Sequence, residues 1–90
     1  MRITTNQLPK LGDYIAYQTR VYNDQSELEL CLTGKLSGTE LTMLLAKGSV
    51  KSEQTAQESL KTSVEKSALE LYDRKAYSKG QSFEKFINIS

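Results

Sequence analysis

The chain has 90 residues, 12 of them basic and 11 acidic, which is enough for one small domain and too short for two. It contains no histidine, no tryptophan and a single cysteine. The commonest general base, the commonest zinc ligand and an internal disulfide are therefore excluded. We expect a protein that is not an enzyme and that binds no metal, no cofactor and no small-molecule substrate.

Hydropathy and charge indicate where the protein is located and which class of partner it binds. The longest uninterrupted apolar run covers only residues 43–46, and the N-terminal residues show no apolar signal core, so we expect a cytoplasmic protein without a membrane span. The formal net charge is +1, which is too small to capture nucleic acid by electrostatics alone. A protein partner is therefore the default expectation, and direct binding of nucleic acid ranks below it.

A β-hairpin is the clearest element of the pattern. Residues 14–22 are rich in aromatic and β-branched side chains, and their odd positions suit a core. After turn formers at residues 23–26, residues 27–33 alternate three leucines with polar side chains. We predict a hairpin over residues 14–33 whose leucine face is covered by helices, because an isolated hairpin is only marginally stable. Residues 1–13, which contain a proline and a glycine, are interpreted as an arm or a short edge strand.

The first helix is predicted over residues 38–47. Ser37 and Glu40 form the S-x-x-E pattern that satisfies free amides at a helix start, and Gly48 ends the helix. The apolar stripe expected to face the hairpin is formed by Leu41, Leu44 and Leu45.

A long helix is predicted over residues 52–79, where no proline or glycine interrupts the chain before Gly80. At 1.5 Å per residue such a helix would be about 40 Å long, which exceeds the width expected of a globule of this size. Either part of it projects into a partner or it breaks into two helices, and the pattern leaves both open.

The last predicted element is an apolar tail over residues 82–90, which has four large apolar side chains. It docks on its own domain, on a second subunit or on another protein.

Two sets of candidate protein-binding residues follow from the helix and hairpin assignments. The outer hairpin face offers aromatic and arginine side chains of the kind enriched at binding hot spots, and the long helix offers an apolar stripe that serves a partner or a second copy. These residues are Tyr14, Arg20 and Tyr22 on the hairpin, and Leu60, Val64, Leu71 and Tyr72 on the helix.

One resemblance favours DNA binding. The sequence Leu-Leu-Ala-Lys-Gly at residues 44–48, with Leu36 and Glu40 before it and Glu53, Ala56, Leu60 and Ser63-Val64 after it, resembles the helix-turn-helix of LuxR-type transcription regulators. That resemblance implies a recognition helix over residues 63–78, with DNA contacts from Lys61, Lys66, Arg74 and Lys75. Glu65 and Glu70 would then face the DNA groove, which disfavours this alternative.

A second resemblance concerns the whole layout. A bent arm, a hairpin and a polar helical half resemble the small accessory regulators of bacteria and temperate phages, such as antirepressors that bind a repressor protein. We therefore expect an α+β fold in which the N-terminal arm and an antiparallel β-hairpin pack on a short helix and a long helix. The function expected is non-enzymatic binding of a transcription factor, whose assembly or access to DNA is altered, by a protein that self-associates, with a dimer favoured. The alternatives are a helix-turn-helix DNA-binding regulator and a structural subunit of a larger assembly.

Overall fold

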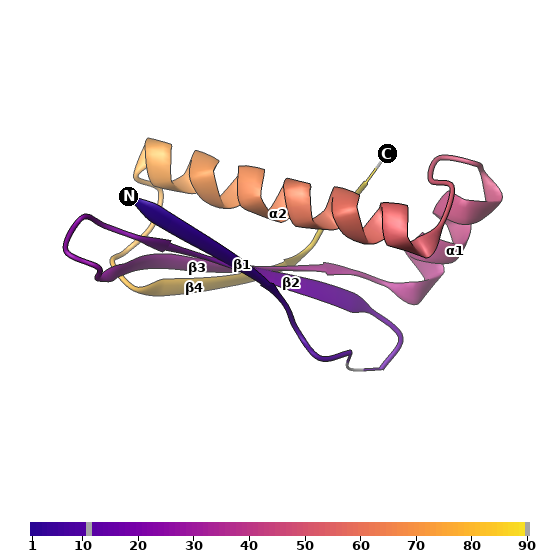
Figure 1. Cartoon of the computed structure of the whole chain (residues 1–90), viewed down its shortest axis with the longest axis horizontal. Coiled ribbons are helices and arrows are strands. Elements are labelled where there is room, and N and C mark those ends of the chain that lie inside the picture. Colours follow the sequence, from indigo (N-terminus) through magenta and orange to yellow (C-terminus); the bar gives the residue numbers. More distant parts are fainter. Residues whose placement is uncertain (11, 90) are drawn as a thin grey trace.

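The computed structural model describes residues 1–10 and 12–89 and shows an α+β fold (Figure 1). Leu11, inside the predicted arm, and Ser90, at the end of the predicted tail, lie outside the described residues. In chain order the elements are β1 (Arg2–Gln7), β2 (Ile15–Tyr22), β3 (Leu28–Leu36), α1 (Gly38–Ala46), α2 (Glu53–Arg74) and β4 (Gln81–Phe86).

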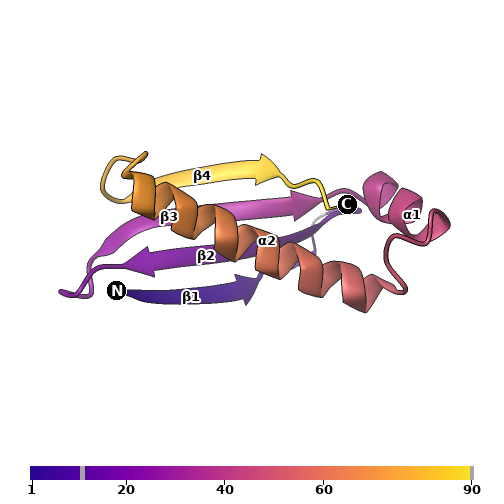
Figure 2. The ribbon, with the colours of Figure 1, turned by 90° about the horizontal axis from the view of Figure 1, so that it is seen from above.

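The four strands form one mixed sheet in the order β1-β2-β3-β4. The first three strands are antiparallel neighbours, whereas β4 runs parallel to β3. A parallel neighbour requires the chain to return to the end of the sheet where β3 begins, and the segment that contains both helices makes this crossover. As a result α2 lies along one face of the sheet above β2 and β3, and no helix of the described chain covers the other face (Figures 1 and 2).

The predicted hairpin is confirmed, and its odd β2 positions and the leucines Leu30 and Leu32 of β3 face the core. Leu28 of the predicted leucine face is only half-buried and pairs with Tyr22 where the register shifts. In β2 the side chains of Tyr17, Thr19 and Val21 are buried on the side of α2, and in β3 Leu30 and Leu32 are fully buried. The predicted arm contributes a real edge strand, β1, which pairs with β2. The side chains of α2 that meet this surface recur every four residues and are fully buried: Ala56, Leu60, Val64 and Ala68.

Gly34 brings α2 close to the sheet. A Cβ atom built on this residue would lie 2.3 Å from Cγ2 of Val64 and 2.9 Å from Cγ1 of Ile87. Any side chain at position 34 would therefore push the helix away from β3 or displace residue 87. The close approach of α2 explains why position 34 is a glycine, although the neighbouring positions on the same face of β3 are leucines.

The first helix begins at the predicted residue, but it does not pack on the hairpin in the way that was predicted. Ser37 caps it, since its hydroxyl accepts a hydrogen bond from the Glu40 amide at 3.1 Å. The stripe expected to face the hairpin is narrower than predicted, because Leu44 is buried whereas Leu45 is 40% exposed. Figure 2 shows the reason: α1 lies beyond the ends of the strands, beside the start of α2, and does not lie flat on the hairpin.

The long helix is a single helix that ends earlier than predicted. It begins after Ser52, whose hydroxyl accepts a hydrogen bond from the Thr55 amide, and it ends at Arg74, well before Gly80. Lys75 adopts the left-handed conformation with φ 54°, and its amide donates to the carbonyls of Leu71 and Tyr72. This closure is usually made by glycine, so the sequence pattern did not place it at a lysine.

The first half of α2 does not project from the molecule, and the helix does not break into two, so both alternatives for this helix are wrong. The helix has 22 residues and is about 33 Å long, which fits within the 44 Å long axis of the chain. Its N-terminal half contributes Ala56 and Leu60 to the core, and Val64 follows at the middle of the helix. The molecule accommodates the helix by being elongated.

The predicted apolar tail is a strand for most of its length. Residues 81–86 form β4 on β3, and Ile87 continues past the strand end into the core, where it is 9% exposed. The tail therefore docks on its own domain, the first of the alternatives considered above. Strand formation was not predicted, because the sequence Gln-Ser-Phe-Glu-Lys-Phe has no β-branched residue and its partner strand is distant in the sequence.

Candidate interaction surface

The face of the sheet opposite α2 is the candidate functional site, and we call it the open face. Side chains alternate between the two faces of a strand, and the register of the sheet shows which ones share this side. The open face consists of Arg2, Thr4 and Asn6 from β1; Tyr14, Ala16, Gln18, Arg20 and Tyr22 from β2 and the residue before it; Cys31, Thr33 and Lys35 from β3; and Ser82, Glu84 and Phe86 from β4.

The centre of the open face is formed by small side chains. Ala16, Cys31 and Thr33 are only 5%, 6% and 8% exposed although no helix of the described chain covers them. Their larger neighbours on adjacent strands shield them. Gln18 bridges the central strands, since its amide nitrogen donates to the Thr33 hydroxyl at 3.2 Å. The centre is therefore low and polar, and the large side chains lie at the two ends.

One end of the open face combines two arginines with a tyrosine. Arg2 of β1 is the cross-strand partner of Tyr22, and its guanidinium carbon lies 4.6 Å from the centre of the Tyr22 ring. Arg20, two residues before Tyr22 on the same face, is exposed. The contribution of Arg2 was missed by sequence reasoning, because it depends on the register between β1 and β2.

The other end is an aromatic cluster around a lysine. The rings of Tyr14 and Phe86 meet edge to face with centroids 6.2 Å apart, and the Lys35 ammonium lies 5.2 Å and 5.6 Å from their centres. Lys35 also forms an ion pair with Glu84. The hydrogen bond from Lys35 to Glu84 is the main cause that raises the pKa of the lysine above its usual value, so it stays charged. Phe86 is 64% exposed.

A hollow of about 220 Å³ lies beside this aromatic cluster. It is lined by Leu8, Pro9, Tyr14, Ala16, Gln18, Thr33, Lys35 and Glu84. Pockets for cofactors and drug-sized ligands usually measure about 300–1,000 Å³, so this hollow is smaller than such sites.

Three of the sequence-predicted contact residues share the open face without forming one cluster. Tyr14 and Tyr22 are eight residues apart on an extended strand, which separates them by about 26 Å. Arg20 lies near Tyr22 and belongs to the arginine end. A partner that touched both tyrosines would have to span the length of the sheet.

The four sequence-predicted contact residues on the long helix lie elsewhere. Leu60 and Val64 are fully buried under their own sheet, so this part of the prediction is corrected: neither side chain is available to a partner of the folded chain. Leu71 and Tyr72 are half-buried and pack against the core, and the Tyr72 ring stacks on Tyr77 with centroids 6.1 Å apart.

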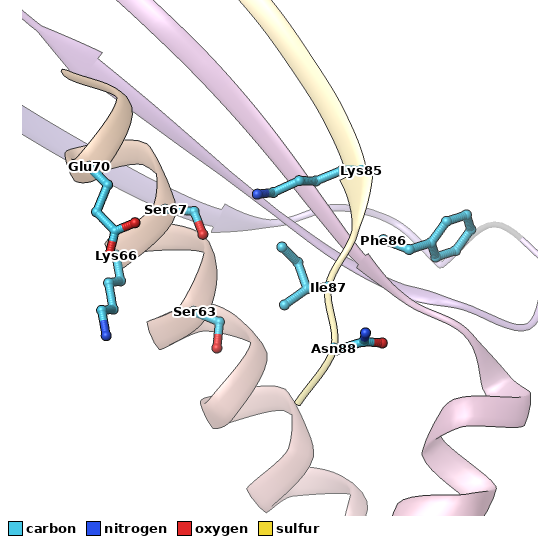
Figure 3. A pocket seen from close by; sticks show the side chains of 8 residues that line it. All are labelled: Ser63, Lys66, Ser67, Glu70, Lys85, Phe86, Ile87 and Asn88. Carbon is cyan, nitrogen blue, oxygen red and sulfur yellow. The ribbon is translucent and has the colours of Figure 1, made fainter. Parts of the chain in front are cut away.

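A second hollow lies on the helix side, between α2 and β4 (Figure 3). It measures about 360 Å³ and is lined by Ser63, Lys66, Ser67, Glu70, Lys85, Phe86, Ile87 and Asn88. Figure 3 shows Lys85 and Ile87 directed toward the helix and Phe86 directed away from it. The wall formed by α2 is entirely polar, with two serines, a lysine and a glutamate. The groove therefore lacks the apolar enclosure that binding sites for small ligands usually have.

The helix-turn-helix geometry is not formed. The residues proposed for a recognition helix, 63–78, divide between the second half of α2 and the turn that follows it.

Among residues 1–10 and 12–89, no group of three or more metal-ligating side chains comes together. No described helix is long and apolar enough to cross a membrane. No protein-family model matches the chain, and neither a curated protein nor a solved structure shows significant similarity to it.

Proposed function

We propose that the chain is a small protein-binding regulator that uses the open face of its sheet as its contact surface. The observation that carries the proposal is the position of aromatic and arginine side chains at both ends of a face that no described helix covers. Exposed Arg20 and half-buried Tyr22 lie at one end, and exposed Phe86 and half-buried Tyr14 lie at the other. Aromatic side chains and arginine supply much of the binding energy at protein interfaces. The low polar centre between these two ends accommodates a partner without burying charge.

The class of partner rests on the resemblance to antirepressor-type regulators alone. By that resemblance the partner is a repressor or another transcription factor, whose assembly or access to DNA changes when the open face is occupied. Self-association was expected because an apolar stripe on the long helix needed cover. The chain's own sheet provides that cover, so a dimer needs a different interface.

Direct binding of nucleic acid is the weaker alternative on this surface. The positive side chains of the open face are Arg2, Arg20 and Lys35, and Lys35 is paired with Glu84. Two arginines at one end neutralise few phosphates, whereas electrostatic binding of DNA requires several basic side chains on one face. A protein partner needs no such charge.

The test compares variants in one quantitative binding assay. The tagged chain captures partners from a cell lysate, mass spectrometry identifies them, and the dissociation constant is measured with the purified partner. We expect Arg20→Ala and Tyr22→Ala each to weaken binding about tenfold, which is 1.4 kcal/mol. The matched control is Gln54→Ala, an exposed site on α2, which should bind within about twofold of the wild type. Equal binding by all three variants would refute the open face as the contact surface.

A parallel measurement covers the nucleic-acid alternative. Fluorescence anisotropy with mixed-sequence duplex DNA is measured at about 50 mM and 200 mM salt. A protein-binding module shows no salt-dependent signal of DNA binding over this range. Affinity that falls steeply with salt and depends on Lys66 and Arg74 would replace the proposed function with DNA binding.

A further inference from the structure

The outer strands of the sheet differ in the surface that they offer to another strand. β1 and β4 form the two edges, and each has six residues. The last five residues of β1 carry no formal charge, and their only large apolar side chain is Ile3. β4 presents two phenylalanines, with Phe83 half-buried beside the core and Phe86 64% exposed on the open face. The β4 edge therefore has more apolar surface to bury against another chain.

The free edge of β4 offers the backbone groups of alternate residues. The Ile87 amide donates to the Lys35 carbonyl at 2.8 Å, which turns residue 87 toward β3. Backbone groups alternate along a strand, so those of Ser82, Glu84 and Phe86 face the free edge. A second strand can bind there only by pairing with these three residues.

A second copy of β4 can pair antiparallel with the first around a twofold axis in very few registers. The two sheets continue into one another only if residues on the same face stand opposite each other, and this places the axis at a residue. With six residues in the strand, five pairs form only when that residue is Phe83 or Glu84. An axis at Glu84 would put two carboxylates directly opposite each other, which is destabilising.

The register centred on Phe83 has no such conflict. It places Phe83 opposite its own copy, Ser82 opposite Glu84, and Gln81 opposite Lys85. Ser82 and Glu84, whose backbone groups face the free edge, then form the hydrogen-bonded pairs. By the same count β1 has two equivalent registers, centred on Thr4 and Thr5, and nothing in its sequence selects between them. Only β4 specifies one way to pair with itself.

We infer that two copies of this chain associate through β4 to form a continuous eight-stranded sheet with its twofold axis at Phe83. Phe86 of one copy then stands opposite Gly80 of the other, where no side chain obstructs it. The open faces of the two copies lie on the same side, so the dimer presents two contact surfaces. The inference does not depend on the proposed function, because it rests on the backbone groups along the β4 edge and not on the side chains of the open face.

Cysteine pairing tests the register. In a Cys31→Ala background, Phe83→Cys places two cysteines at the axis, in a pair of the closely spaced type that a disulfide can join. Because Phe83 is half-buried, a second test uses the exposed positions 81 and 85. Gln81→Cys and Lys85→Cys should form a mixed disulfide when combined, and neither variant alone should form a disulfide-linked homodimer. The matched controls are Glu84→Cys and Thr4→Cys, which should form no disulfide-linked dimer under oxidation.

Sedimentation equilibrium measures the same association without cysteines. We expect the average mass to rise with protein concentration and Ser82→Pro to raise the dimer dissociation constant about tenfold or more, because the proline removes two symmetric edge hydrogen bonds and none to β3. Ser82→Ala is the control and should leave the constant within about threefold. Two results would overturn the inference. One is that Glu84→Cys or Thr4→Cys forms the disulfide while Phe83→Cys and the mixture of Gln81→Cys with Lys85→Cys do not. The other is a monomer mass that does not change with protein concentration.

Discussion

The contact between Gly34 and α2 gives the sharpest test of the packing. A Cβ atom at position 34 would lie 2.3 Å from Cγ2 of Val64, more than 1 Å inside an ordinary contact between carbon atoms. Overpacking of a well-packed core costs about 1–3 kcal/mol, and the helix has to lift from the sheet here. We expect Gly34→Ala to lower the free energy of unfolding by about 3 kcal/mol.

The partner residue makes the prediction specific. Val64→Ala alone removes two buried methyl groups and should cost about 2 kcal/mol. In the double variant Gly34→Ala/Val64→Ala the new methyl group occupies the space that the valine leaves. A Cβ atom at position 34 still lies 2.9 Å from Cγ1 of Ile87, so the double variant should be about 1 kcal/mol less stable than Val64→Ala alone. This corresponds to a coupling energy of about 2 kcal/mol.

Chemical denaturation followed by circular dichroism measures all four proteins, with the slope of the transition checked for two-state behaviour. The control pair is Gly34→Ala with Val21→Ala. Val21 lies in the core about 13 Å along the strand from the residue opposite Gly34, so the two effects should add. If the Gly34 and Val64 effects also add, the close approach of helix and sheet is wrong.

Three further predictions concern the ends of elements. Lys75 holds a left-handed conformation, so Lys75→Gly should raise the free energy of unfolding by about 1 kcal/mol in the same denaturation assay; no gain would argue against that closure. Ser52→Ala should lower it by about 1 kcal/mol, since the Thr55 amide loses its cap, and an unchanged midpoint would contradict this. Hydrogen bonds from Lys79 and then Asn23 lower the pKa of Glu27 from its ordinary 4.5. The ionised Glu27 side chain therefore contributes its full stabilisation above pH 4.5 and loses it as the pH falls through the lowered pKa. The melting temperature should consequently fall less between pH 6 and pH 3 for Glu27→Gln than for the wild type.

The elements that the sequence predicted correctly are those specified by neighbouring residues. The hairpin follows from strict alternation in residues 27–33, and the start of α1 follows from the spacing of Ser37 and Glu40. Both signals act over a few residues and do not depend on distant contacts. The elements that were missed depend on tertiary structure. β4 forms because β3 offers a parallel edge, and α2 ends at Arg74 because Lys75 begins the turn toward β4.

The candidate contact residues divide in the same way. The apolar stripe on α2 was assigned to a partner or to a second copy of the chain, because the sequence does not say which apolar surface covers it. The structure gives the stripe to the chain's own sheet. On the open face, alternation within β2 identified Arg20 and Tyr22, whereas Arg2 and Phe86 joined them only through pairing between strands.

The width of the sheet explains why function is expected on its surface. Four strands at about 4.8 Å spacing are wider than one helix of about 10 Å, so α2 covers only the central pair. The side chains under α2 are committed to folding. The open face and the β4 edge lie outside the area that α2 covers and include the exposed side chains of Arg20 and Phe86. A charge reversal at an exposed position of the open face, such as Arg20→Glu, would therefore leave the core intact and weaken the binding of a partner, which separates binding from stability in a single variant.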